Sequence, residues 1–182
     1  AEKPSVAEDI ARVLDAGKKE SNYWKGNDVV VTWAIGHLLE LMTPEEYDKK
    51  YHRWSLEHLP IIPENFATKP KKDKSRKQQL KAITGLLSDG SITEIVNACD
   101  AAREGELIFW EIIDYANSEI ETSRMWLQSM TKSAILTAFE GRKKSSEFHG
   151  LRDAAVARAQ ADWIIGMTGS RAMSIRLPNE KN

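Results

Sequence analysis

Apolar residues recur at helical spacing in several parts of the chain. The first such segment, residues 6–14, follows Ser5, which together with Glu8 predicts an N-cap with a capping box. Thr43 followed by Pro44 predicts the N-cap and first residue of a second, short helix. Further helices are predicted at 73–87, 106–116, 132–139 and 151–167.

Runs of apolar and β-branched residues predict the strands. Two are clear, at residues 29–35 and 92–99, and a shorter candidate covers residues 124–127. Because strands alternate with helices, the pattern predicts an α/β fold whose largely parallel sheet has helices on both faces. Residues 55–72 are irregular and interrupted by prolines, so no element is predicted there.

The composition is that of a soluble globular protein. The 182 residues, 41% hydrophobic and 29% charged, suffice for one α/β domain and part of another. No apolar stretch approaches the roughly 18 residues that a membrane helix needs, and no signal-peptide pattern is present. The single cysteine, Cys99, excludes an internal disulfide and fits a cytoplasmic protein; we expect it to be a buried strand residue without a redox role.

Charge is distributed unevenly along the chain. Residues 1–123 hold 16 Lys and Arg against 22 Asp and Glu, whereas residues 124–182 hold 10 against 5. This segregation indicates an acidic chemical site joined to a basic surface, for which nucleic acid is the commonest partner, although random drift between the two halves explains it equally well. Within the basic run at 69–77, a solvated face is favoured over a phosphate-binding role.

A cluster of charge follows the strand predicted at 92–99. Asp100, Arg103, Glu104 and Glu106 lie within seven positions, between that strand and the next predicted helix. Open α/β sheets place their ligands at the carboxyl ends of strands, and grouped carboxylates can hold a hard cation such as Mg²⁺. The pattern therefore favours a metal and phosphate site.

The same cluster also has a purely structural interpretation. Glu104 and Glu106 would complement the dipole of the following helix, with Arg103 as a salt-bridge partner. This interpretation leaves Asp100, at the strand tip, without a role, so we favour the metal site. Gly105 would then permit the close approach that a strand-to-helix junction requires.

Glu2 and Lys3 precede a predicted helix, at the position where a first strand should have ended. If that strand neighbours the strand before Asp100, Glu2 joins the acidic cluster and Lys3 contacts the same phosphate. Otherwise both are surface residues. The chain begins without Met and ends on polar residues, so we expect it to be cut from a longer polypeptide and to lack this first strand.

Several ordered segments resemble the type IA DNA topoisomerases, specifically the bacterial topoisomerase III branch. The resemblance spans nearly the whole chain, and the combination of segments is far more specific than any one of them. The matching segments are AEKPS at 1–5, VTWAIGHL at 31–38, RW at 53–54, LP at 59–60, DAAREGELI at 100–108, TKSAI at 131–135 and ARAQADW at 157–163.

The resemblance implies a Toprim domain over residues 1–128, with a Rossmann-like, mostly parallel sheet, followed at 129–182 by the start of a helical domain that grips single-stranded DNA. It implies Mg²⁺ as cofactor and an ATP-independent reaction in which one strand is cut through a 5′-phosphotyrosine, another strand passes, and the cut is resealed. It also implies a cytoplasmic, nucleoid- or plasmid-associated bacterial protein. The implied catalytic residues are Glu2, Lys3 and Arg103, the metal ligands Glu2, Asp100 and Glu104, and the DNA-binding residues Arg158, Asp162, Ser170 and Arg171.

The chain departs from the family pattern at two points. The middle acid of the family's Asp-x-Asp-x-Glu pattern falls on Ala102, which has no ligand atom, so we expect weaker or single-ion Mg²⁺ binding. The family's nucleophile is a tyrosine in a later domain. The rest of the same polypeptide is expected to carry it, and this chain alone is not expected to relax DNA. None of the tyrosines of this chain lies in the sequence context of the family's catalytic tyrosine; they are Tyr23, Tyr47, Tyr51 and Tyr115.

Two other classes of function remain open. A Toprim nuclease or primase would use a similar acidic cluster without a tyrosine, and a non-catalytic DNA-binding module would use the acids only in salt bridges. A P-loop NTPase is disfavoured because no glycine-rich loop ends in Gly-Lys-Ser/Thr. The four histidines and Cys99 lack the spacing of a zinc site, and for His37, beside Gly36, a structural role is favoured over one in the active centre.

Overall fold

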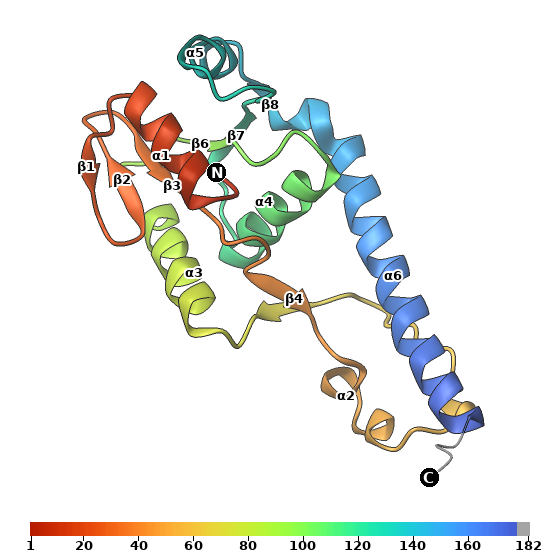
Figure 1. Cartoon of the computed structure of the whole chain (residues 1–182). Helices are drawn as coiled ribbons and strands as arrows, with labels where there is room; N and C mark the ends of the chain where they lie inside the picture. The colour runs from red at the N-terminus through yellow and green to blue at the C-terminus, as the bar shows by residue number, and fades with distance from the viewer. Residues whose placement is uncertain (178–182) are drawn as a thin grey trace. The chain divides into compact units, whose positions relative to one another are not determined.

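The chain divides into two compact units in the computed structural model, which describes residues 1–177 (Figure 1). The first unit comprises Ala1–Leu39 and Pro70–Ala155, and the second comprises Glu40–Lys69 and Val156–Asn182. The last five residues, part of the polar end noted in the sequence, lie outside the described residues.

Four short strands follow the first helix in succession, and from the second α-helix onwards helices and short strands alternate (Figure 1). The α-helices are α1 (Pro4–Val13), α2 (Pro44–Tyr47), α3 (Lys74–Leu87), α4 (Arg103–Ala116), α5 (Lys132–Glu140) and α6 (His149–Arg176). The strands are β1 (Lys18–Lys19), β2 (Tyr23–Lys25), β3 (Val30–Thr32), β4 (Leu39–Leu41), β5 (Thr68–Pro70), β6 (Glu94–Asn97), β7 (Glu121–Arg124) and β8 (Lys143–Lys144). Short 3₁₀ turns are η1 (Lys49–His52), η2 (Leu56–His58) and η3 (Ser145–Phe148).

Side-chain caps set the starts of α3 and α5, and the predicted N-cap position of α2 is confirmed. The Asp73 carboxylate accepts a hydrogen bond from Arg76 N at 2.9 Å and begins α3. The Thr131 hydroxyl accepts one from Ala134 N at 3.3 Å and begins α5. Thr43 precedes α2 as its N-cap. These positions agree because capping is decided by neighbouring residues alone.

Three helices, α1, α4 and α6, begin two or three residues earlier than the periodicity predicts, and α6 also ends later. Ser5 is not an N-cap: α1 begins at Pro4, whose fixed φ suits the first helical position, and Lys3 is the N-cap in extended backbone. The helix predicted from residue 106 begins at Arg103. The last helix, predicted to end near Met167, continues through two glycines to Arg176.

The predicted α/β class is confirmed, but the largely parallel sheet is not: the described strands form three small sheets, β1-β2-β3, β4-β5 and β6-β7-β8, with a mixture of pairings. Strand β6 pairs in parallel with β7, whereas β2 pairs antiparallel with β1 and β3, and β8 pairs antiparallel with β7. The strand predicted at 124–127 lies three residues earlier, as β7. Strands β3 and β6 line a groove of about 330 Å³ with both apolar and polar residues.

Ala1 is bonded to the backbone that leaves β3. Its nitrogen donates to Thr32 O at 2.9 Å, and its carbonyl accepts from Ala34 N at 2.8 Å, which is the hydrogen-bond pattern of a parallel bridge. Glu2 and Lys3 follow directly, so the backbone places both near the carboxyl end of β3.

Two clusters of buried apolar side chains stabilise the first unit. One joins α3 to α4 through residues such as Leu80, Ile108 and Ile112, and it includes Cys99. The other lies under α1, where Ala7, Ile10 and Ala11 pack with Val31 of β3. Cys99 is buried as expected, and desolvation raises the pKa of its thiol, so it remains protonated at neutral pH.

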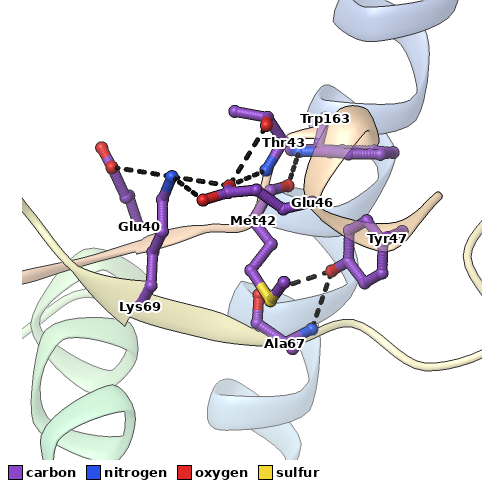
Figure 2. A network of polar contacts seen from close by, with 8 residues as sticks. All are labelled: Glu40, Met42, Thr43, Glu46, Tyr47, Ala67, Lys69 and Trp163. Atoms are coloured by element: carbon purple, nitrogen blue, oxygen red, sulfur yellow. Dashed lines mark hydrogen bonds and ion pairs between the residues drawn. The ribbon is translucent and has the colours of Figure 1, made fainter. Parts of the chain in front are cut away.

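A polar network around Lys69 connects segments of the second unit (Figure 2). Lys69 Nζ lies 2.6 Å from Glu46 Oε2 and 3.6 Å from Glu40 Oε1. Glu46 also accepts a hydrogen bond from Thr43 N at 2.7 Å, which completes the capping box of α2. The network therefore ties α2 to β5.

Trp163 of α6 anchors its helix to the same segments (Figure 2). Its indole Nε1 donates to Met42 O at 3.0 Å. Its ring meets Tyr47 and Phe66 edge-on, with centroids 6.0 and 5.5 Å away. Aromatic pairs in this geometry contribute about 0.5–1.5 kcal/mol beyond their buried area.

The Lys69 contact makes the stability of this region depend on pH. The Lys69 ammonium and the N–H of Thr43 lower the pKa of Glu46 from 4.5 to about 2. Because the folded pKa is depressed, the stabilisation is complete above about pH 4.5 and is lost as the pH falls towards 2. Glu46→Gln should therefore flatten the pH dependence of the free energy of unfolding in this window, measured by urea denaturation.

Glu64→Gln is the matched control for this prediction. Glu64 is an exposed carboxylate of the same unit and makes no ion pair with any of residues 1–177. Substitution of Glu64 should leave the pH dependence of the free energy of unfolding between pH 4.5 and 2 as it is in the wild type. If Glu46→Gln left this pH dependence unchanged, the Glu46–Lys69 contact would not be its cause.

Candidate active site at the acidic turn

The start of α1 and the turn after β6 meet at the side chain of Lys3. Lys3 Nζ lies 3.4 Å from Asp100 Oδ2 and 3.8 Å from Glu2 Oε1. Glu2 comes from the segment beside β3 and Asp100 from the carboxyl end of β6. The structure thus brings together three of the residues that the sequence singles out, over a separation of nearly 100 positions.

Glu2 has an oxygen that the protein does not satisfy. Its side chain is only 12% exposed, and Oε2 is buried without a hydrogen-bond partner among the described residues. A buried carboxylate oxygen without a partner is costly, and a hard cation or a proton would remove that cost. Asp100, by contrast, is 49% exposed and can add a ligand from the solvent side.

The backbone of Asp100 is tightly enclosed. Its carbonyl accepts hydrogen bonds from Ala102 N and from Arg124 Nη2, both at 2.7 Å. A Cβ placed on Gly105 would lie 2.1 Å from the same oxygen, so no other residue fits there without moving the turn. Glycine at this junction is therefore a steric requirement of the acidic turn, as the sequence pattern suggests.

Sequence reasoning missed a buried ion pair beneath this turn. Arg124 Nε lies 2.6 Å from Glu106 Oε1, and the two side chains are 0% and 1% exposed. The sequence interpretation treats Glu106 only as an acid near a helix start and Arg124 as the first residue of a strand. The signal that could have identified the pair is a lone arginine within the apolar end of a short strand, since a buried charge requires a partner.

Glu104 points to a different partner from the other two acids. Gly36, with a left-handed φ of 60°, turns the chain after β3 so that His37 reaches Glu104. The imidazole Nε2 lies 2.5 Å from Glu104 Oε1, and Nδ1 lies 2.8 Å from Glu111 Oε2. His37 therefore contacts the acidic turn directly, which the sequence interpretation ranks below a purely structural role.

The three predicted metal ligands do not form one cluster. Within residues 1–177, no three His, Cys, Asp or Glu side chains lie close enough together to hold a metal ion. Glu2 and Asp100 share the Lys3 ammonium, and Glu104 is paired with His37. Two hard carboxylates and an unsatisfied oxygen suit Mg²⁺, which is commonly bound by one or two carboxylates plus water and phosphate. Arg103 is exposed and makes no polar contact within residues 1–177.

The predicted DNA-binding residues lie on α6 in the second unit and have different surroundings. Arg158 and Asp162 form an exposed ion pair at 3.5 Å, and Ser170 is also exposed. Arg171 is buried: its guanidinium lies 2.6 Å from Glu45 Oε1. The first three are thus accessible to a ligand, and for Arg171 the DNA role remains a prediction.

The fold and the acidic turn between β6 and α4 define the class of protein. The Toprim domain family matches residues 1–130, and the chain belongs to this family. The chain is 42% identical to DNA topoisomerase 3 of Staphylococcus aureus over 176 residues and 41% identical to that of Staphylococcus epidermidis. Each alignment covers 97% of this chain and 24% of the relative, so the chain spans about a quarter of their length.

A solved structure supports the fold independently. Full-length topoisomerase I from Thermotoga maritima superposes with a TM-score of 0.61 over 95% of this chain and 25% of that chain, at 24% identity. The resemblance to topoisomerase III noted in the sequence is thus confirmed.

Within residues 1–177, no helix is both long and apolar enough to cross a membrane.

The contacts of His37 predict its titration. Hydrogen bonding to Glu111 is the largest cause that raises the pKa of His37 above 6.5, and Glu104 adds to it. Because the folded pKa is raised, the associated stabilisation is present below about pH 6.5 and is lost as the pH rises through the folded pKa. The His37 ring protons should therefore titrate by NMR with a midpoint above 6.5.

Two matched variants separate the contributions of Glu111 and Glu104 to the raised pKa of His37. Glu111→Gln should lower the His37 midpoint more than Glu104→Gln, because Glu111 is 13% exposed and Glu104 is 66% exposed to screening solvent. A wild-type midpoint at or below 6.5, or a larger effect of Glu104→Gln, would contradict the geometry.

Proposed function

We propose that this chain is the N-terminal part of a type IA DNA topoisomerase and supplies the acidic half of its active site. Residues 1–128 would be the Toprim domain, and residues 129–182 would begin the helical domain that holds single-stranded DNA. The observation that carries the proposal is the convergence of Glu2 and Asp100 on Lys3 at the carboxyl ends of β3 and β6. The Toprim match and the topoisomerase relatives support it.

The residues of the turn suit a reaction at a DNA phosphate. Mg²⁺, when bound, would supply positive charge to neutralise the phosphate. Glu2 and Asp100 would hold it, and Glu104 would join them by exchanging His37 for the ion. Lys3, 58% exposed, would contact the phosphate that undergoes cleavage. Glu2 Oε2 would take or give the proton of the reacting oxygen, because Oε2 is buried and has no hydrogen-bond partner among residues 1–177. Arg103, exposed beside the turn, would bind the phosphate through its guanidinium.

The partner would be DNA with single-stranded segments, held in part by α6. Arg158, Asp162 and Ser170 are exposed on that helix and would contact the strand, and Arg171 would support them from within the second unit. The nucleophilic tyrosine would come from the rest of the same polypeptide. The reaction would be transient cleavage, strand passage and resealing without ATP, in a cytoplasmic protein near the nucleoid or a plasmid.

A Toprim nuclease or primase is the second candidate function. It needs only the acidic turn, and the Toprim match by itself extends over residues 1–130 without requiring the later helix. The two candidates differ in the product, because only a topoisomerase leaves protein covalently attached to the 5′ phosphate of the cut strand.

The test uses the longer polypeptide in which we propose that the chain acts. With Mg²⁺ and a single-stranded oligonucleotide, denaturant quenching should trap protein on the 5′ side of a break. Glu2→Gln should reduce cleavage by on the order of 10²–10⁴-fold, the usual contribution of a proton-transferring group. Glu8→Gln, which removes an exposed acid of α1, should cleave as the wild type does. Cleavage without an adduct would favour the nuclease, and no Mg²⁺-dependent cleavage would overturn both functions.

The lack of a carboxylate at Ala102 predicts how many Mg²⁺ ions the chain binds. Calorimetric titration of the chain with Mg²⁺ should reveal one site, because the N-cap position of α4 lacks a carboxylate. Ala102→Asp should tighten binding by on the order of tenfold by adding a charged ligand. Ala102→Asn is the control: it should add about 1 kcal/mol of N-cap stability, as Asp does, but leave Mg²⁺ binding unchanged. Two tight sites in the wild type would contradict this account.

A further inference from the structure

We propose that the buried pair Arg124–Glu106 is a positioning device that fixes the geometry of the acidic turn and hence the spacing of Asp100 and Glu104. The pair touches neither predicted ligand's carboxylate and acts through the backbone. The inference rests on the proposed function of these two acids as metal ligands. The contacts that support it come from the turn itself, from β7 and from α4.

The guanidinium of Arg124 holds the end of β6 through backbone carbonyls. Its Nη1 donates to Cys99 O at 2.7 Å and to Asn97 O at 3.1 Å, and its Nη2 donates to Asp100 O at 2.7 Å. The same Nη1 donates to Met125 O at 3.1 Å, which joins the ends of β6 and β7. One side chain therefore reaches four carbonyls. Asn97 O and Asp100 O also accept from the backbone N–H groups of Met125 and Ala102, whereas Arg124 is the donor found for Cys99 O and Met125 O within residues 1–177.

Glu106 joins this group to α4. Its Oε1 accepts from Asn97 Nδ2 at 3.3 Å in addition to its contact with Arg124, and its Oε2 accepts from Trp110 Nε1 at 3.2 Å. Glu106 lies in the first turn of α4, two residues after Glu104. Fixing Glu106 against β6 therefore fixes the start of the helix that carries Glu104.

The pair also explains the direction of the Asp100 side chain. Successive carbonyls of a strand point in opposite directions, yet those of Cys99 and Asp100 both reach the same guanidinium. The backbone must leave strand geometry at this point, and the Asp100 side chain then projects towards Lys3 and solvent. An apolar pair of equal volume could fill the space but could not bind these carbonyls.

The decisive variant removes both charges at once. Arg124→Met alone leaves the Glu106 carboxylate buried without its partner and should lower the melting temperature by on the order of 10 °C. Arg124→Met combined with Glu106→Leu should recover most of that loss, because a buried pair can often be replaced by apolar side chains. If the pair positions the ligands, the double variant should still need about ten times more Mg²⁺ for half-saturation in calorimetry.

The hydrogen-exchange rate of the Ala102 amide reports directly on the geometry of the acidic turn. In the wild type this N–H is bonded to Asp100 O, and the double variant should exchange it at least about tenfold faster once the carbonyl loses its Arg124 partner. This readout does not require metal. If the wild-type chain bound no Mg²⁺, the proposed metal site would fail, and exchange at Ala102 would still decide the positioning claim.

The matched control is a second ion pair on the same sheet. Arg142 binds Glu94, at the start of β6, with Nε–Oε1 and Nη2–Oε2 distances of 2.9 and 2.8 Å. Arg142→Met with Glu94→Leu should leave both Mg²⁺ half-saturation and Ala102 exchange unchanged. Wild-type Mg²⁺ affinity and wild-type Ala102 exchange in the Arg124–Glu106 double variant would overturn the inference and leave the pair a purely structural one.

Discussion

The buried ion pair between Arg124 and Glu106 is the constraint on which the acidic turn depends. Removing one member of such a pair costs about 3–5 kcal/mol, which is a large fraction of the 5–15 kcal/mol that stabilises a typical domain. The cost arises because the remaining charge, with 0–1% exposure, cannot reach water. The turn is consequently held in one geometry, with β6, β7 and α4 joined at a single point.

The predicted site needs such a support because its residues repel one another. Glu2 and Asp100 are brought together from the segments after β3 and β6, and only the Lys3 ammonium lies between them. Gly105 allows α4 to approach the Asp100 carbonyl, and His37 holds Glu104 to one side. The arrangement is a half-neutralised acidic site that a divalent cation and a phosphate can complete.

Local signals in the sequence were sufficient for much of the fold. The start of α2 at Thr43 and Pro44 was predictable because it is decided by neighbouring residues. The acidic cluster was recognisable from residues 100–106, and the Toprim relationship from that cluster together with the other ordered segments that match the family. The Arg124–Glu106 pair was not, because its partners are 18 positions apart and each residue separately fits a surface role. The last helix was predicted to be too short, because the buried contact of Arg171 with Glu45, beyond the predicted end near Met167, is not visible in the local sequence.

Crystals of the chain grown with Mn²⁺ in place of Mg²⁺ would test the central claim most directly, through the anomalous scattering of the bound ion. The account predicts one peak, within about 2–2.5 Å of a Glu2 or Asp100 oxygen, with the Asp100 carbonyl still bound to Arg124. A peak elsewhere on the protein, or none at saturating Mn²⁺, would contradict the assignment of the acidic turn as the metal-binding half of a topoisomerase active site.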